Sequence, residues 1–187
     1  DVTFDLEGHL VQSFARALAV PEEAAMINGD GVDKPTGVLV SASVGVTAAS
    51  ASVITADELI DLYYSLKRVY RDKAVWLLND TTVKAVRKLK DTDGNYLWSK
   101  GLASEPDTIL GRPIKPADGV PSFAAGAAVI AFGDFSYYQI ADRSARRFQR
   151  LNELYSAKGQ VGFRGYERVD GKLTLAEAVK VLKMAAA

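Results

Sequence analysis

Apolar residues at helical spacing predict a long helix near the start of the chain. Leu6, Leu10, Phe14 and Leu18 recur every four residues and form one stripe along a helix face. Pro21 interrupts this pattern, because proline lacks a backbone N–H and clashes with the preceding turn. We therefore expect either a kink at this position or two helices end to end.

A turn rich in glycine and proline follows the predicted helix. Gly29 and Gly31 lie in the sequence Asn-Gly-Asp-Gly. We expect them to end the helix, because glycine enters left-handed backbone conformations at low cost. Pro35 and Gly37 then redirect the chain into a short apolar run. The residues that define this predicted turn are Gly29, Asp30, Gly31, Pro35 and Gly37.

The strongest helical pattern in the chain begins after Thr55. Thr55 and Glu58 have the spacing of a capping box. The apolar side chains that follow at helical spacing are Leu59, Leu62, Tyr63, Leu66, Val69 and Tyr70. A second helix is expected after a cap at Asn79 or Asp80, and its apolar face is formed by Val83, Val86 and Leu89.

Short apolar runs predict strands in the rest of the chain. The runs are 74–78, 96–98, 111–114, 128–132, 137–140, 161–166 and 179–182. Residues 41–52 read as a loop or a poorly packed strand, 91–95 as a turn, and Asp170-Gly171 as a hairpin turn. Because helices and strands are mixed without a regular alternation, the expected fold class is α+β.

Composition excludes several kinds of protein. The 187 residues are 48% hydrophobic and 25% charged, as in an ordinary globular protein. The chain has no cysteine, so it forms neither disulfides nor thiolate metal sites. No apolar run is long enough to span a membrane. The net charge is zero, which gives no support for a dedicated nucleic-acid binder but leaves room for a local basic patch.

One group of acidic residues is a candidate for metal binding or acid–base chemistry. Asp30, Asp33, Asp57 and Glu58 could form an oxygen-rich metal or acid–base cluster. Helix capping and solvation explain the same residues more simply. His9 is the only histidine, and no nucleophile elbow, P-loop or dinucleotide fingerprint occurs. A small metal-dependent hydrolase or binding domain therefore remains only an alternative.

The densest basic stretch contains four arginines, and two interpretations remain open for it. They could contact the phosphates of DNA, or they could form salt bridges with neighbouring subunits or a solvated face. These residues are Arg143, Arg146, Arg147 and Arg150.

The order of several short motifs resembles the major capsid proteins of tailed phages, the family named after the Hong Kong 97 phage. A long helix ending in Asn-Gly-Asp-Gly and followed by Pro-x-Gly-Val-Leu is the first of them. The others are Leu89–Tyr96, Leu110–Ile114, Phe132–Phe135, Phe163–Arg168 and Ala178–Leu182. Each motif is short, but together they cover nearly the whole chain in the expected order.

The resemblance implies a Hong Kong 97-type fold with a long spine helix. Residues 1–52 and 133–170 would form a peripheral domain that meets neighbouring capsomers. Residues 53–132 and 171–187 would form an axial domain that points loops at the five-fold and quasi-six-fold axes. The family's N-terminal arm and extended loop would lie upstream of residue 1. Since the chain also lacks an initiator Met, we expect it to be a fragment or processed product.

The implied function is structural. Many copies would assemble into pentamers and hexamers of an icosahedral shell around DNA, without catalytic residues, cofactor or metal. The implied partners are other copies of the chain, a scaffold or protease, a portal and packaged DNA, with no membrane. The implied location is the virion capsid, after a stage in the host cytoplasm during assembly or as a prophage product. An encapsulin-type nanocompartment shell is the alternative within the same fold.

Some members of the family crosslink their shells through Lys–Asn isopeptide bonds aided by a Glu. The Asn position aligns near Gly159, with Asn152 as the one nearby alternative, and the Glu position aligns near Tyr166 or Glu167. Because glycine cannot accept such a bond, the resemblance predicts no crosslinking of this kind.

Overall fold

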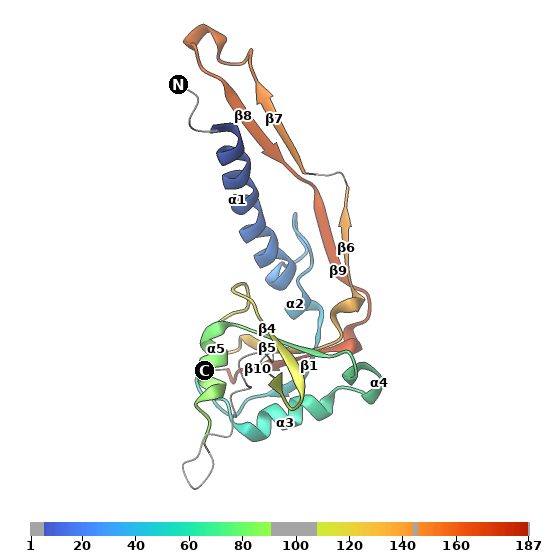
Figure 1. The fold of residues 1–187 in the computed structure, drawn as a ribbon. Coiled ribbons are helices and arrows are strands. Elements are labelled where there is room, and N and C mark those ends of the chain that lie inside the picture. The colour runs from blue at the N-terminus through green and yellow to red at the C-terminus, as the bar shows by residue number, and fades with distance from the viewer. Residues whose placement is uncertain (1–5, 91–107, 144–145, 187) are drawn as a thin grey trace.

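The chain folds into a compact body and a long arm (Figure 1). The computed structural model describes residues 6–90, 108–143 and 146–186. The body is built on a six-stranded sheet. The arm consists of the helix α1 (Leu6–Asn28) and a ribbon of antiparallel strands, β6 (Tyr138–Asp142) with β9 (Val169–Leu173) and β7 (Arg147–Leu151) with β8 (Gly162–Tyr166). Mixed helix and sheet confirm the α+β class.

The body sheet has the strand order β1-β10-β5-β2-β4-β3. Its central strands β10 (Val179–Lys183), β5 (Ala128–Gly133) and β2 (Val75–Leu78) pair antiparallel. Parallel pairs flank them, with β1 (Ser43–Thr47) beside β10 and β4 (Arg112–Pro116) beside β2. The short β3 (Thr108–Ile109) completes one edge. The strands predicted at 74–78, 111–114, 128–132 and 179–182 are thereby confirmed, with β4 beginning at Arg112.

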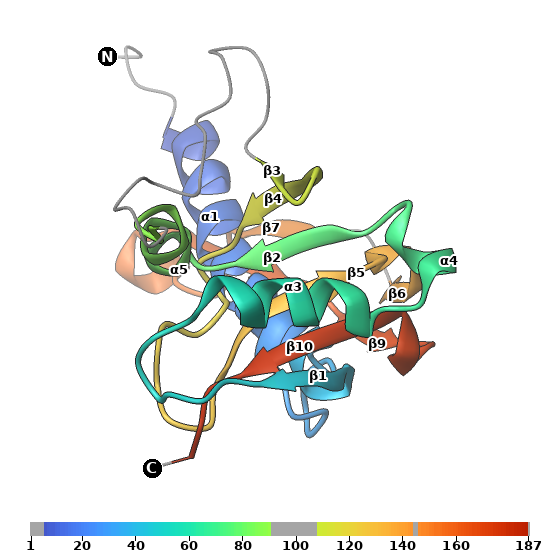
Figure 2. The ribbon, with the colours of Figure 1, turned by 90° about the horizontal axis from the view of Figure 1, so that it is seen from below.

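Helices cover the two faces of this sheet (Figure 2). The capping box predicted at Thr55 is present and starts α3 (Ala56–Ser65), and the Asn79 side chain caps α5 (Asp80–Arg87). The short α4 (Arg68–Arg71) follows α3. On the opposite face lie α2 (Val38–Ser41) and the end of α1. Single turns of 3-10 helix span Phe135–Tyr137, Ser156–Lys158 and Ala176–Ala178.

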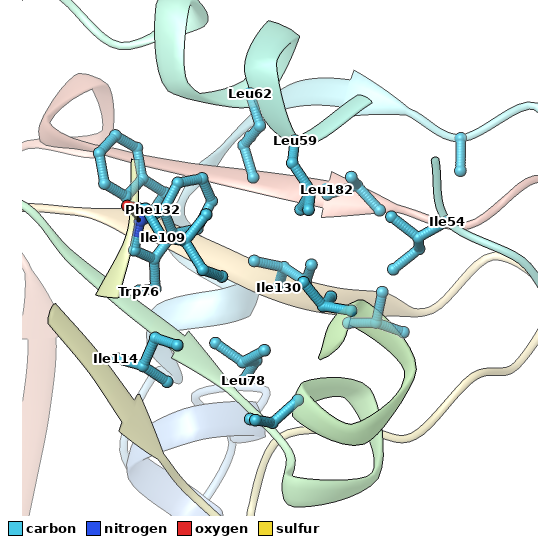
Figure 3. Packing of buried hydrophobic residues seen from close by; sticks show 14 of the residues in the cluster. Ile54, Leu59, Leu62, Trp76, Leu78, Ile109, Ile114, Ile130, Phe132 and Leu182 are labelled. Atoms are coloured by element: carbon cyan, nitrogen blue, oxygen red, sulfur yellow. Dashed lines mark hydrogen bonds between the residues drawn. The ribbon is translucent and has the colours of Figure 1, made fainter. Parts of the chain in front are cut away.

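Strand alternation divides the core into two clusters. Ile130 and Phe132 of β5 point to the α3 side, whereas Ala131 between them packs with Ile27 of α1 on the other side. On the α3 side, Trp76 stacks on Phe132 with ring centroids 4.1 Å apart, and its indole N–H donates to the carbonyl of Ile109 over 2.9 Å (Figure 3). Because the second cluster includes the last turn of α1, the arm is anchored to the body by buried apolar contact.

The spine helix continues through its proline. α1 is continuous from Leu6 to Asn28 with Pro21 inside it, so the expectation of two helices is wrong. Packing against the ribbon outweighs the hydrogen bond that proline removes. Of the predicted stripe, Leu10, Phe14 and Leu18 are half-buried, whereas Leu6 is 54% exposed.

Three expectations about segment boundaries are corrected. Residues 41–52 contain β1, which belongs to the body sheet, so the boundary expected at 52 lies before Ser43. Asp170-Gly171 is not a hairpin turn, because both residues pair with β6 inside β9. The boundary expected between 170 and 171 therefore cuts a continuous strand of the arm. The predicted turn at 91–95 and strand at 96–98 lie outside the described residues.

Candidate functional site

The predicted turn joins the arm to the body. The N–H of Gly37 donates to the carbonyl of Gly29 over 2.8 Å, which closes the turn directly after α1. The N–H of Thr36 donates to the carbonyl of Gly171 on β9 over 2.9 Å, and the Tyr138 hydroxyl of β6 donates to the carbonyl of Thr36 over 3.1 Å. The Asn28 side chain donates to the carbonyl of Gly119, in a loop of the body. One short segment thus holds the helix, the ribbon and the body together.

Glycine is needed in this turn mainly because other backbone atoms approach closely, and less because the backbone is left-handed. Gly31 has a φ of 80°, as expected, but it lies three residues beyond the helix end. Gly29 is not among the residues with positive φ, so its expected left-handed conformation is wrong. A Cβ on Gly29 would overlap the carbonyl of Pro35, and a Cβ on Gly37 would lie 2.5 Å from the backbone N of Gly29. These positions need glycine because two backbone segments touch there.

The acidic residues of the turn and of α3 are used locally. Asp30 accepts from the N–H of Val32 and pairs with Lys34 at 3.3 Å, and both contacts hold the pKa of Asp30 below its usual range. Glu58 accepts from the N–H groups of Thr55 and Ala49. Among the described residues, no group of three or more acidic or histidine side chains is arranged to hold a metal ion. The metal-dependent alternative gains no support from this geometry.

Aromatic side chains connect α1 to the ribbon. Phe14 of α1 meets Phe148 of β7 edge to face, with ring centroids 5.5 Å apart, and Phe148 stacks on Phe163 of β8 at 5.6 Å. Phe14 also lies over Gly165, where a Cβ would approach its ring to 2.9 Å. Because Phe148 is directly opposite Gly165 in the strand register, the glycine makes room for the helix. This contact identifies the ribbon face that packs on α1.

An ion-pair cluster reinforces the same contact. Arg146 donates to Glu167 at 2.5 Å and also pairs with Glu22 of α1. Both carboxylates are largely shielded, with side-chain exposures of 13% for Glu167 and 18% for Glu22. The Glu167 hydrogen bond, with the charge of Glu22, raises the pKa of Arg146. One guanidinium therefore links the second half of the spine helix to the ribbon.

The four arginines predicted as one patch do not lie on one face. Arg146 points toward α1, since it contacts Glu22. Arg147 follows it on the strand and so projects from the opposite face. Arg150 shares the face of Phe148, and its guanidinium donates to Asn152 over 2.9 Å. Arg143 is exposed next to β6, and its N–H donates to the carbonyl of Arg168. Local sequence could not reveal this division, because it depends on the register with β8.

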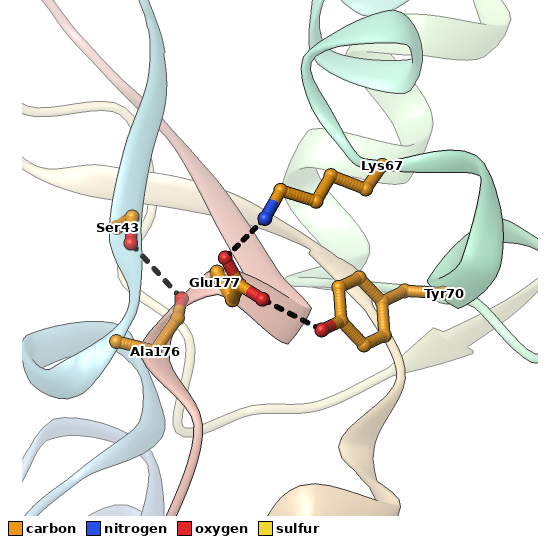
Figure 4. Close-up of polar contacts among 5 residues, drawn as sticks. All are labelled: Ser43, Lys67, Tyr70, Ala176 and Glu177. Carbon is orange, nitrogen blue, oxygen red and sulfur yellow. Dashed lines mark hydrogen bonds and ion pairs between the residues drawn. The ribbon is translucent and has the colours of Figure 1, made fainter.

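A polar cluster fixes α4 against the start of β10 (Figure 4). Glu177 accepts from the Lys67 ammonium at 2.5 Å and from the Tyr70 hydroxyl at 2.7 Å. These two hydrogen bonds lower the pKa of Glu177, and the Glu177 carboxylate raises the pKa of Tyr70. The cluster was not anticipated from the sequence, because its members are more than 100 positions apart.

Comparison with known proteins identifies the family. A family model described as the phage capsid family matches residues 1–184. The chain belongs to the phage capsid family. It is therefore a structural capsid protein, and the resemblance expected from the motif order is confirmed. No protein among the curated sequences matches it.

Solved structures share the fold over essentially all of this chain and about two thirds of their own length. The capsid of an empty GTA particle is 40% identical, covering 100% of this chain and 68% of its own, with a TM-score of 0.88. The Gordonia phage Cozz structure is 15% identical, covering 98% of this chain and 68% of its own, with a TM-score of 0.70. An encapsulin complex from Synechococcus elongatus PCC 7942 is 17% identical, covering 98% and 67%, with a TM-score of 0.69. The last two show the fold alone, so the nanocompartment alternative is less supported than the capsid reading.

The positions considered for crosslinking lie at the ribbon tip and beside the ion-pair cluster. Gly159 ends a 3-10 turn at the tip with a φ of 67°, and Asn152 accepts from Arg150. Glu167 is held by Arg146, on the α1 side of the ribbon. The absence of Lys–Asn crosslinks stays a prediction. No described helix is long and apolar enough to cross a membrane.

Proposed function

We propose that this chain is a shell subunit that assembles with copies of itself into pentamers and hexamers of an icosahedral capsid around DNA. The observation that carries the proposal is the 40% identity over the whole chain to a capsid subunit of a GTA particle. The architecture supports it, because a body and a projecting arm offer separate surfaces to different neighbours (Figure 1). Such repeated contacts between identical subunits close into a symmetric assembly.

Exposed apolar side chains lie on both the arm and the body. At the ribbon tip, Leu154 is 64% exposed and is joined by Tyr155 and Val161. On the body, Tyr64 of α3 and Val69 of α4 are 65% and 81% exposed. Large exposed apolar side chains of this kind mark interaction surfaces. In the proposed shell they contact neighbouring subunits, so that each copy is held through both its arm and its body.

The proposal includes further partners that a phage shell needs. A scaffold or protease guides assembly, a portal occupies one vertex, and DNA fills the interior. Assembly takes place in the host cytoplasm, and the product resides in the virion. Membership of the phage capsid family and the structural role of the chain support these proposed partners.

Substitution of one exposed apolar residue on the arm and one on the body tests the proposal. Leu154→Ser and Tyr64→Ser should each leave the monomer folded by circular dichroism and reduce the fraction of large assemblies in sedimentation velocity. Val32→Ser provides a matched control, because Val32 is also 69% exposed but lies in the turn between arm and body. If Leu154→Ser and Tyr64→Ser both assembled as the wild type does, the proposed contacts would be contradicted.

A further inference from the structure

Acidic and apolar side chains share the exposed face of α3. Asp57 and Asp61 lie one helical turn apart, and Ile60 and Tyr64 lie one turn apart beside them. Ile60 and Tyr64 are 41% and 65% exposed, and both carboxylates are exposed as well. Neither carboxylate forms a hydrogen bond or an ion pair in the described part of the chain. We call this set the α3 strip: Asp57, Ile60, Asp61 and Tyr64.

A basic cleft lies between α5 and β4. It has a volume of about 500 Å³, and part of its lining is apolar. Its described lining also holds three basic side chains, Lys84, Arg87 and Lys88, and one carboxylate, that of Asp80. Lys84 and Lys88 are exposed, and their ammonium groups form no hydrogen bond or ion pair in the described part of the chain. We call this hollow the α5 cleft.

The α3 strip and the α5 cleft are complementary in charge and in spacing. Asp57 and Asp61 are four residues apart in α3, and Lys84 and Lys88 are four residues apart along α5 and its C-cap. Four residues of helix rise by about 6 Å in either case. The two carboxylates of one copy of the chain can therefore meet the two ammonium groups of another copy as a pair of ion pairs.

Apolar contact would accompany these ion pairs. Ile60 and Tyr64 project from the same helix face as the two carboxylates, and the apolar part of the α5 cleft is formed by Val83, Ile114 and Pro116. Removing such apolar surface from water drives association, because exposed ion pairs contribute little free energy by themselves. The charges would instead select the partner and its orientation.

The two surfaces belong to different sides of the body. α3 runs along the lower side of the body in Figure 1, and α5 lies on its left side; Figure 2 shows α3 in front of the sheet and α5 at its left end. Each copy can therefore offer α3 to one neighbour and the α5 cleft to another. A contact between two different surfaces of identical subunits repeats around an axis until the ring closes.

We propose that the α3 strip of one copy docks into the α5 cleft of the next copy around a capsomer ring. This inference rests on the proposed function and names the two surfaces of the body that form the ring contact. It gives Asp57 a role in subunit contact, in place of the metal-binding role considered from the sequence.

Charge reversal in the full-length gene product tests the inference. Asp57→Lys with Asp61→Lys, and separately Lys84→Glu with Lys88→Glu, should each lower the fraction of protein in rings and shells about tenfold or more in sedimentation velocity. The reason is that like charges then face each other across the contact. A variant with all four substitutions restores opposite charges and should recover assembly.

The control reverses two other lysines of the body. Lys73→Glu with Lys183→Glu changes the net charge by the same amount as the α5 variant, at exposed positions outside both surfaces. This control should assemble as the wild type does. Circular dichroism of every variant verifies that the chain is folded.

Mixing the two double variants adds a geometric test. The reversed strip of one variant fits the reversed cleft of the other, so the two must alternate around a ring. Alternation requires an even number of subunits. The mixture should therefore give hexameric rings and no pentameric rings in negative-stain electron microscopy.

Each outcome bears on one claim. Shells from wild type and from both double variants would overturn the docking contact and leave the proposed function standing. Failure of the fourfold variant to assemble, beside a normal control, would also overturn it and assign the two surfaces to partners other than a second copy. Pentameric rings in the mixture would contradict the pairing as well. An absence of rings and shells from the wild type, co-expressed with its neighbouring genes, would overturn both the proposed function and this inference.

Discussion

Single residues at the turn between arm and body decide how the two parts meet. Gly37 has φ and ψ of −64° and 148°, which alanine adopts freely, so its requirement is spatial. Its hydrogen would be replaced by a methyl group 2.5 Å from the carbonyl oxygen of Ile27 and from the backbone N of Gly29. Neither atom can move without breaking the end of α1.

Gly37→Ala should therefore lower the free energy of unfolding by about 3 kcal/mol, the upper part of the range for overpacking. Gly111→Ala separates this clash from backbone strain, because Gly111 has a φ of 73° with open space around it. It should cost only about 1 kcal/mol. Urea unfolding of both variants measures the difference. Equal losses would show that the close approach at Gly37 does not matter.

The Glu177 cluster predicts a dependence of stability on pH. Lys67 and Tyr70 stabilise the ionised carboxylate and lower its pKa, so the contribution is present above the unfolded pKa of about 4.3. It is lost as the pH falls below that value through the lower folded pKa. The free energy of unfolding of wild type should exceed that of Glu177→Gln at pH 7, and the gap should narrow toward pH 3. A constant gap over this range would rule out the ionised cluster as the cause.

At the scale of elements, the sequence pattern predicted those helix starts and strands that depend on residues close together in the chain. The capping box at Thr55, the cap at Asn79 and the apolar runs of β2, β5 and β10 were all readable, because each depends on neighbours in sequence. The other features depend on the pairing of strands that are distant in sequence. Asp170-Gly171 has the composition of a turn, yet both residues pair with β6 inside β9, and the Tyr138 side chain lies against Gly171. The division of the predicted arginines between the two faces of the ribbon depends on the register of β7 with β8, which no single segment contains.

The ion pairs of Arg146 should control how tightly α1 holds the ribbon. Arg146→Gln leaves Glu22 and Glu167 facing each other without a cation, so amide hydrogen exchange should become several-fold faster in β7, β8 and the second half of α1. Exchange in the body sheet should not change. Arg147→Gln removes the same charge one residue away on the opposite face and serves as the control. Faster exchange in the control alone, or in neither variant, would reject this role of the cluster.

At the scale of the whole molecule, the arm formed by α1 and the ribbon extends away from the body (Figure 1). The turn, the aromatic contact and the ion pairs hold the arm in one direction, which sets the position of the ribbon tip relative to the body. The overall class and the long helix were predictable from motif order, but the direction of the arm was not. It depends on contacts between residues as distant as Thr36 and Gly171.

Negative-stain electron microscopy of the full-length gene product, with and without its neighbouring genes, tests the central claim most directly. The account predicts closed shells or capsomer rings of uniform size, with light scattering to match. It also predicts that denaturing gels of these particles show no ladder of Lys–Asn crosslinked chains. A protein that remains monomeric at every salt and protein concentration, even when its neighbouring genes are co-expressed, would contradict the assignment as a shell subunit.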